Sequence, residues 1–305
     1  MILTVSPPGS KTLPAPSLPW FRSLVRAAER GGLDAILFDG QWGPSSAFNL
    51  DPIPLIVALA ECSTRIGLAG AIEIDHAEPF NIARSFAAAD RLTAGRSALI
   101  AATGALRPGD FGHAPKRTPA ERCARAAECI AVARKLWDSW EDEAILLDKP
   151  NGRFSNPDVV HPINHAGAFF TVRGPLNAPR PLQGNPPVIL RDATPEGLAL
   201  ARESADLFIA PESSDLAAIR QAIGDRPRLL ATLPFTGKPE TFAAQLAERL
   251  PLCDGIDVVT ADLEAFADEV VPLLRARGLR PPAYAGKTLR EHLGLARPRS
   301  QFAAA

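Results

Sequence analysis

RKLWDSWEDEAILLDKPNGRFSNPDVVHPINHAGAFFTVRGPLNAPRPLQGNPPVIL, residues 134–190, begins with a helical pattern and ends with a buried strand. The long stretch between them is neither low in complexity nor very polar. A connection of this length inside a compact domain is usually functional or disordered. Its apolar anchors argue against disorder. They are Phe154, Val159, Val160, Ile163, Phe169, Phe170 and Val172. We therefore expect an ordered excursion over about residues 141–186, of the kind that walls the site of a barrel enzyme.

On both sides of this stretch, short β-rich runs alternate with amphipathic helical patterns. The predicted strands are Ile2–Val5, Asp34–Phe38, Ile66–Ile74, Ser97–Ala102, Pro187–Leu190, Asp206–Ile209, Arg228–Leu233 and Gly255–Val259. The predicted helices lie near Leu18–Arg30, Pro52–Cys62, Pro79–Arg91, Pro119–Trp140, Pro195–Ser204, Leu216–Ile223, Pro239–Leu250 and Leu263–Arg277. Near-continuous apolar strands suit a parallel sheet that is covered on both faces.

Eight such βα units predict an α/β protein with a single (β/α)8 TIM barrel domain over residues 1–305. A doubly wound open sheet is the alternative. No GxGxxG motif follows the first strand, and its absence counts against an open dinucleotide-binding fold. The barrel is therefore the predicted fold.

The composition excludes several classes of function. Apolar residues make up 46% of the chain and charged residues 22%, which are ordinary globular values. The net charge of −1 and the scattered basic residues predict no binding to nucleic acid or to a membrane surface. The N-terminal MILTVSPPGSK lacks the pattern of a signal peptide, and no apolar run is long enough to span a membrane. Four dispersed cysteines match no metal spacing and predict reduced thiols in a cytoplasmic protein.

In a barrel of this kind, the chemistry lies at the C-terminal ends of the strands. The residues that follow the predicted strands from the second onward are Asp39, Gly40, Gln41, Glu73, Asp75, His76, Thr103, Gly104, Arg191, Asp192, Thr194, Glu212, Ser213, Thr236, Gly237, Thr260 and Asp262. Asp39 either points into the barrel mouth or caps an Asx-type turn. The sequence leaves these two alternatives open.

Glu73, Asp75 and His76 form a candidate group for acid–base chemistry beside a substrate pocket. Strand alternation places Glu73 and Asp75 on the same face. The alternative is a salt-bridge cluster in the loop with Arg84 or Arg65. The sequence allows both arrangements.

Three other patterns have a plain structural explanation. His161 and His165 have the spacing of a zinc pair, but Pro162 breaks any helix there, so loop hydrogen bonding is expected. The two tryptophans of LWDSW are more typical of helix packing than of a cofactor stack. Thr194 begins a helix, where its hydroxyl could bind an anion or act as an ordinary N-cap. No serine lies in a nucleophile elbow.

The run LWDSWEDEAILLDKPNGRFSNPDVVHPINHAGAFFTVRGPLNAPRPLQGNPPVI resembles the flavin-dependent monooxygenases of the bacterial luciferase superfamily. The resemblance is to the nitrilotriacetate monooxygenase component A type, which includes sulfone and chelator monooxygenases. It extends to AERGGLDAILFDG (28–40), EPFNIARSFAAADRLTAGR (78–96) and YAGKTLREHLGLARP (284–298). It implies a (β/α)8 barrel in which reduced FMN, supplied by a separate flavin reductase, reacts with O2 and oxygenates a small-molecule substrate.

The resemblance also assigns cofactor-binding residues. Asp39 matches the acidic residue after the second strand, and Thr103 matches the threonine that lines the flavin ring after the fourth. After the fifth strand, Gln-Ala-Gly-Ala-Ser of the family is replaced by Leu190-Arg191-Asp192-Ala193-Thr194, in which Thr194 replaces the serine and Arg191 is a candidate flavin contact.

Other positions depart from the family pattern. In the fourth helix, His-x-x-Arg-Tyr is replaced by Pro119-Ala120-Glu121-Arg122-Cys123, so the usual imidazole and phenol are absent. Asp192 brings a carboxylate to the place where the flavin phosphate is expected.

The family's large late insertion is missing, since Arg228–Thr236 leads almost directly into GKPETF. The sequence therefore predicts an FMN-dependent, two-component monooxygenase that forms a homodimer. The alternative is a degenerate family member that binds flavin weakly or not at all and serves as a binding or assembly protein.

Overall fold

The computed structural model describes residues 1–7, 17–38, 50–74, 76–104 and 117–303. Within these ranges, eight parallel strands close into a barrel in the order β1-β12-β11-β10-β9-β4-β3-β2. The strands are β1 (Ile2–Ser6), β2 (Ala35–Phe38), β3 (Gly67–Glu73), β4 (Ser97–Ala102), β9 (Val188–Leu190), β10 (Leu207–Ala210), β11 (Arg228–Pro234) and β12 (Gly255–Val259). The predicted barrel is confirmed, and the open-sheet alternative is wrong.

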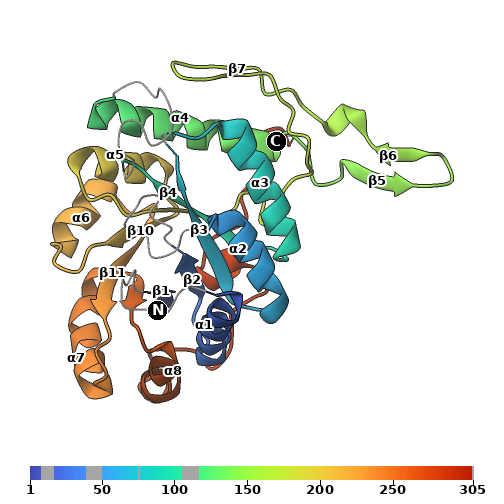
Figure 1. Cartoon of the computed structure of the whole chain (residues 1–305). Helices are drawn as coiled ribbons and strands as arrows, with labels where there is room; N and C mark the ends of the chain where they lie inside the picture. The colour runs from blue at the N-terminus through green and yellow to red at the C-terminus, as the bar shows by residue number, and fades with distance from the viewer. Residues whose placement is uncertain (8–16, 39–49, 75, 105–116, 304–305) are drawn as a thin grey trace.

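Helices surround the barrel (Figure 1). They are α1 (Leu18–Gly31), α2 (Pro52–Leu59), α3 (Pro79–Leu92), α4 (Pro119–Asp138), α5 (Pro195–Ser204), α6 (Leu216–Ile223), α7 (Pro239–Arg249), α8 (Leu263–Ala265), α9 (Val271–Ala276) and α10 (Leu289–His292). Short 3-10 helices follow α2 (Ala60–Cys62) and α7 (Leu250–Leu252), a third spans Pro157–Val159, and a π-helix (Phe266–Val270) joins α8 to α9. Proline often occupies the first helical turn, where its missing N–H costs no hydrogen bond. None of the helices in the described ranges has the length and apolar character that a membrane span requires.

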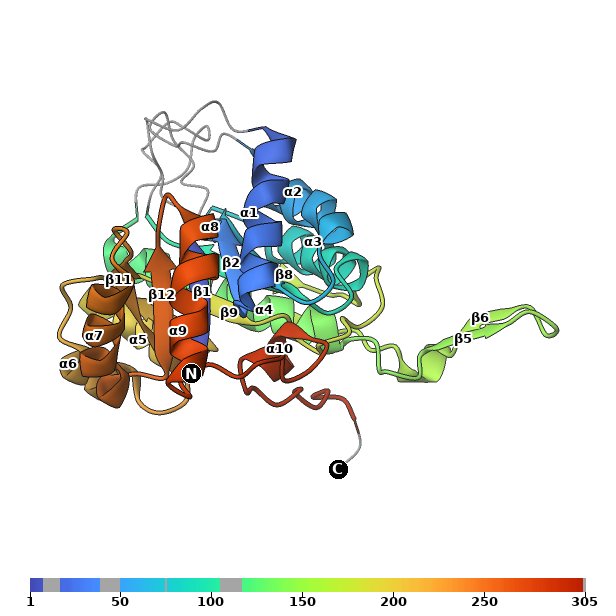
Figure 2. The same cartoon turned by 90° about the horizontal axis from the view of Figure 1, so that it is seen from below.

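The interior of the barrel is filled by side chains from alternate strand positions. The buried apolar members are Ile2, Ala35, Leu37, Ala69, Ala71, Ala98, Ile100, Ile189, Leu207, Ile209 and Leu230. Leu289 and Leu293, from α10 and the residue after it, belong to the same cluster and close the N-terminal end of the barrel. In Figure 2, α10 and the C-terminal segment lie along this end. A side chain at Gly67 would meet Leu289 within 2.5 Å, so glycine allows this closure.

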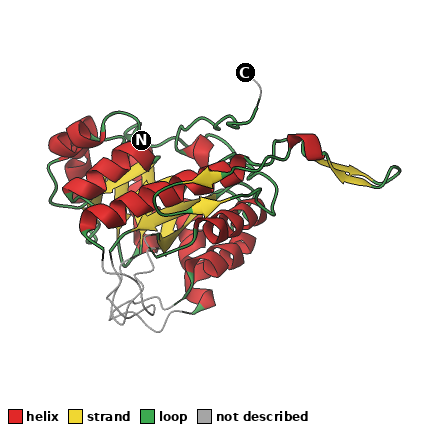
Figure 3. Cartoon of the chain, turned by 90° about the horizontal axis from the view of Figure 1, so that it is seen from above, coloured by secondary structure: helices red, strands yellow, loops and turns green. Residues whose placement is uncertain are grey.

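The segment 141–186, all of which is described, contains two antiparallel hairpins. The first pairs β5 (Ile145–Asp148) with β6 (Arg153–Ser155), and the second pairs β7 (His165–Ala166) with β8 (Thr171–Val172). The segment joins the C-terminal end of α4 to the N-terminal end of β9, so it starts at the face opposite to the strand C-termini. The β5–β6 hairpin projects away from the barrel (Figure 3).

The β7–β8 hairpin instead lies along α4. Glu128 accepts hydrogen bonds from the backbone N–H groups of Phe169 (3.0 Å) and Phe170 (2.9 Å). The guanidinium of Arg125 lies 4.5 Å from the ring centroid of Phe170 and donates to the carbonyl of Ile74, directly after β3. The expected site wall is therefore formed by this hairpin only indirectly, through Arg125, and not by the projecting β5–β6 hairpin.

All four cysteines are free thiols, as the sequence predicted. Cys129 is buried in α4, and burial raises the pKa of its thiol to about 12. A thiol with so high a pKa stays protonated at neutral pH and is a poor nucleophile. This cysteine therefore has a packing role.

Candidate functional site at the mouth of the barrel

A hydrogen-bonded group of polar side chains lies inside the barrel near the C-terminal ends of the strands. It consists of Thr4 and Ser6 on β1, Asp257 on β12 and Arg191 directly after β9, and we call it the inner polar cluster. Asp257 accepts from the Thr4 hydroxyl (2.7 Å), the Ser6 hydroxyl (2.8 Å) and the Arg191 guanidinium (3.2 Å). Arg191 also donates to Ser6 at 2.6 Å.

The members of this cluster differ in exposure. The side chain of Asp257 is fully buried, whereas that of Arg191 is 27% exposed. A buried carboxylate is costly unless a cation and hydrogen bonds compensate it. Asp257 therefore holds the guanidinium at the barrel mouth, where one side of it faces solvent. Such a fixed cation is suited to binding an anionic or carbonyl-bearing group.

The sequence predicted Arg191 as a site residue but missed its three partners. Asp257 lies in the middle of a predicted strand with apolar neighbours, and a charged residue there needs a partner. That signal could have indicated Asp257. It could not have indicated Ser6, which is 251 positions away in the sequence.

Glu73 ends β3 and is 6% exposed. Its register partner on β4 is Ala102, and His76 donates its backbone N–H to the Glu73 carbonyl at 3.2 Å. Asp75 and Asp39 lie outside the described residues, so the predicted grouping of Glu73, Asp75 and His76 and the predicted orientation of Asp39 stay predictions.

The alternative of a salt bridge from this group to Arg65 or Arg84 is not what the structure shows. Arg65 precedes β3 at the opposite end of the barrel and donates to the carbonyl of Gly286 at 3.3 Å. Arg84 is on α3 and lines a groove between α2 and α3. Seven residues of β3 separate Glu73 from Arg65, which is too far for a salt bridge.

The N-terminus of α5 is occupied by residues of the chain itself. Thr194 is the N-cap, and its hydroxyl accepts from the Gly197 N–H at 3.1 Å. The Asp192 carboxylate accepts from the Thr194 N–H at 2.9 Å and from the Thr103 hydroxyl at 3.3 Å. The N-cap expected for Thr194 is confirmed, and Thr103 and Thr194, two of the four predicted cofactor-binding residues, meet around Asp192.

This arrangement does not fit a flavin phosphate. Helix N-termini bind anions through free N–H groups and the positive end of the helix dipole. Here the Asp192 carboxylate already supplies the negative charge. A Cβ on Gly197 would lie 2.4 Å from the Asp192 carboxyl carbon, so Asp192 packs closely on the first turn of the helix.

The start of α4 is likewise satisfied by its own residues. Thr118 and Glu121 form a capping box around Pro119, with the Thr118 hydroxyl accepting from the Glu121 N–H at 3.2 Å. Cys123, where the family has a tyrosine, is 8% exposed. The Arg122 guanidinium lies close to Gly104, just beyond the end of β4.

The two histidines of the excursion form hydrogen bonds to glutamates, as expected. His161 Nε2 lies 2.7 Å from Glu141 Oε1, and His165 Nε2 lies 3.0 Å from Glu128 Oε1. Among the described residues, no group of histidine, cysteine or carboxylate side chains could hold a metal ion.

Both tryptophans of LWDSW are packing residues, as predicted. Trp137 is fully buried and donates to the Ala83 carbonyl at 2.9 Å. Trp140 donates to the Leu176 carbonyl at 2.6 Å. Neither is arranged as a cofactor stack.

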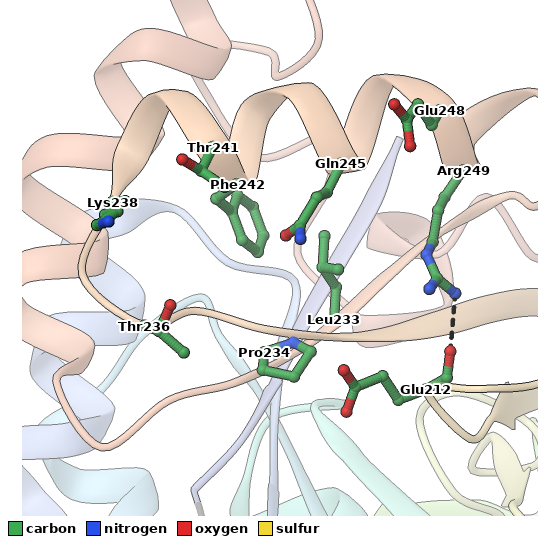
Figure 4. Close-up of a pocket in the computed structure, with 10 residues that line it drawn as sticks. All are labelled: Glu212, Leu233, Pro234, Thr236, Lys238, Thr241, Phe242, Gln245, Glu248 and Arg249. Carbon is green, nitrogen blue, oxygen red and sulfur yellow. Dashed lines mark hydrogen bonds between the residues drawn. The ribbon is translucent and has the colours of Figure 1, made fainter.

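A separate depression of about 330 Å³ lies outside the barrel, between β11 and α7 (Figure 4). Its residues of opposite charge are Glu212, Lys238, Glu248 and Arg249, and Arg249 donates to the Glu212 carbonyl at 3.0 Å. Only four residues join β11 to α7, in agreement with the predicted loss of the late insertion. Most of its polar side chains are exposed, so this depression is a surface feature and not the barrel mouth.

A closed parallel (β/α)8 barrel with polar side chains at the C-terminal ends of its strands is the architecture of an enzyme. The family model of luciferase-like monooxygenases matches residues 1–232. The chain therefore belongs to the luciferase-like monooxygenases, and it is an oxidoreductase of that family.

Several curated proteins are similar to this chain. One of the two similar subunits of pristinamycin IIA synthase from Streptomyces pristinaespiralis is 35% identical, over 95% of this chain and 94% of its own length. N-acetyl-S-(2-succino)cysteine monooxygenase of Bacillus subtilis is 25% identical, over 94% and 92%. That alignment extends over 405 positions, more than the 305 residues here, so the relative has stretches that this chain lacks. Nitrilotriacetate monooxygenase component A of Aminobacter aminovorans is 34% identical over 68% of this chain and half of its own length.

Solved structures agree on the fold. EDTA monooxygenase from Chelativorans sp. BNC1 superimposes with a TM-score of 0.83 at 23% identity, covering 97% of this chain and 98% of the other. Long-chain alkane monooxygenase gives 0.84 at 21% identity, covering 96% and 95%. At these identities the likeness concerns the fold alone.

Proposed function

We propose that this chain is the oxygenating component of a two-component monooxygenase. It would use O2 and reduced FMN, supplied by a separate flavin reductase, to oxygenate a small organic substrate. We further propose that it is a cytoplasmic homodimer and that residues 1–305 form one barrel domain. The family membership is the observation that carries this proposal.

The ring end of the flavin is the part that the described residues can accommodate. The barrel interior below the mouth is apolar, and Arg191 presents a cation that Asp257 holds in place. When bound, the flavin would supply the oxygen chemistry, and the chain would bind and orient it and exclude water. Because the α5 N-terminus does not fit the phosphate, we assign no phosphate ligand there.

A second function is favoured by Asp192. A chain whose helix N-terminus carries its own carboxylate could serve as a non-catalytic partner that binds flavin weakly or not at all. Two different subunits of pristinamycin IIA synthase are similar to this chain, and their names describe parts of one enzyme. Glu73 and His76 at the described rim of the mouth are the candidate substrate contacts if the chain is catalytic.

One titration distinguishes the two functions. Purified protein is titrated with FMN and, under anaerobic conditions, with reduced FMN, and binding is followed by flavin fluorescence and calorimetry. The monooxygenase proposal expects saturable binding of the reduced form and substrate-dependent O2 consumption once a flavin reductase is added. Absence of binding to both forms would contradict it and favour the partner function.

Replacing Asp192 with glycine is expected to strengthen FMN binding several-fold. One like charge near a partly screened phosphate costs on the order of 1 kcal/mol. Asp192→Asn removes the charge and keeps an oxygen for the Thr194 N–H. Glu196→Gln changes the same net charge on the first turn of α5 and is the matched control. Calorimetric titration at low and moderate salt measures all four proteins. Equal or weaker FMN affinity in both Asp192 variants would show that the phosphate does not approach this helix.

A further inference from the structure

The β5–β6 hairpin and its turn (residues 145–155), which we call the arm, have no support from the rest of the described chain. Its hydrogen bonds are internal to the hairpin, and within the described residues none joins it to a helix or to the barrel. An isolated two-stranded hairpin is at best marginally stable in water. This arm therefore needs a surface to pack on.

The side chains of the arm indicate what kind of surface that is. Leu146 is 39% exposed, Leu147 65% and Phe154 61%. Leu147 has a positive φ of 51°, at an irregularity in the pairing of the two strands. Apolar side chains gathered on one exposed hairpin mark a protein–protein contact.

An apolar groove of about 520 Å³ lies on the outer surface between α2 and α3. Its lining residues are Ile53, Pro54, Val57, Asn81, Arg84, Ser85, Ala88, Ala89 and Leu92. Leu92, at the end of α3, is 64% exposed. The groove therefore presents the apolar surface that the arm lacks.

The arm and the groove lie on the same side of the molecule. In Figures 1, 2 and 3 the arm leaves the body on the side where α2 and α3 are located, and it extends beyond them. Because the arm extends away from the body, it does not cover the groove of its own chain. A second copy that faces this side would bring its groove to the arm and its arm to the groove, as a twofold axis requires.

Charge is complementary as well. Arg84 is the only charged residue among the described residues that line the groove. Glu143, at the base of the arm, is exposed. Within the described part of the chain, neither residue forms an ion pair. An acidic arm base and a basic groove would set the orientation of the two copies.

We propose that the arm of one copy packs in the α2–α3 groove of a second copy of this chain, and that the exchange is reciprocal. This inference does not depend on the proposed function, because it concerns a surface on the outside of the barrel. The partner is a second copy because one chain carries both complementary surfaces on one side.

Light scattering after size exclusion tests the proposal. The wild type is expected to have twice the mass of one chain. Leu147→Asp combined with Phe154→Asp on the arm, and Leu92→Asp in the groove, should each raise the dissociation constant on the order of tenfold or more. Leu252→Asp is the matched control, since Leu252 is 50% exposed and lies after α7. Circular dichroism verifies that each variant is folded.

Disulfide cross-linking identifies the contact itself. Phe154→Cys and Leu92→Cys are prepared separately, mixed and oxidised. A covalent dimer is expected in the mixture and not in either variant alone or in the wild type. A monomeric wild type, a dimer that survives the arm variant, or association only with a different family member would each overturn the proposal.

Discussion

Arg280→Ala is expected to lower the free energy of unfolding by about 3–5 kcal/mol, because it leaves the buried carboxylate of Asp34 without its cation. The two side chains are 4% and 5% exposed and form two hydrogen bonds of 2.7 Å. Arg280 also donates to the carbonyls of Met1 (3.0 Å) and Gly32. It therefore fastens the C-terminal segment to the N-terminal end of the barrel.

Urea denaturation followed by tryptophan fluorescence measures this loss. Arg277→Ala is the matched control, because Arg277 is exposed and surface substitutions usually change stability by about 0.5 kcal/mol or less. Adding Asp34→Asn to Arg280→Ala should restore part of the stability. The amide removes the buried charge and still offers an oxygen to the Leu3 N–H, which donates to Asp34 at 2.8 Å. A loss below about 1 kcal/mol would show that the pair does not contribute as a buried ion pair does.

The barrel could be predicted from the sequence because its elements are encoded locally. Each strand is a short apolar run, and each helix has its own stripe and cap, such as Pro195 after Thr194. The order of the strands around the barrel then follows from the right-handed βαβ rule. The predicted strands and helices agree with those of the structure within a few residues.

The interior of the site could not be predicted in the same way. Ser6 and Asp257 are joined only when β1 and β12 close the barrel, so no local pattern relates them. The hairpins of the excursion were also missed. Their strands have two to four residues each, and their pairing depends on contacts with α4 such as those of Glu128.

Asp192 shows a different limit. The family comparison predicted a carboxylate beside the flavin phosphate, and it could not show that this carboxylate serves as the anion of its own helix. That role depends on the turn between β9 and α5, where Asp192 accepts from Thr194 and Thr103. A substitution identified from a pattern has its physical meaning only once its hydrogen-bond partners are known.

Asp257→Ala is expected to destabilise the protein by about 3 kcal/mol. The change removes the acceptor for the Thr4 and Ser6 hydroxyls and for Arg191, and an unsatisfied buried donor costs about 1–3 kcal/mol. The partial exposure of Arg191 keeps the loss below that of a fully buried pair. Asp257→Asn retains one acceptor oxygen and should lose less.

A double-mutant cycle isolates the contact between the two charged groups. Arg191→Met keeps much of the stem and removes the charge, and it is combined with Asp257→Asn. The two changes together should cost less than the sum of the single changes, with a coupling energy of about 1–3 kcal/mol. Urea denaturation gives the four free energies of unfolding. Additive losses would mean that Asp257 is held by Thr4 and Ser6 alone, and that Arg191 is not fixed at the mouth. In that case the barrel would present no positioned cation to the flavin ring, while the fold and the family membership would be unaffected.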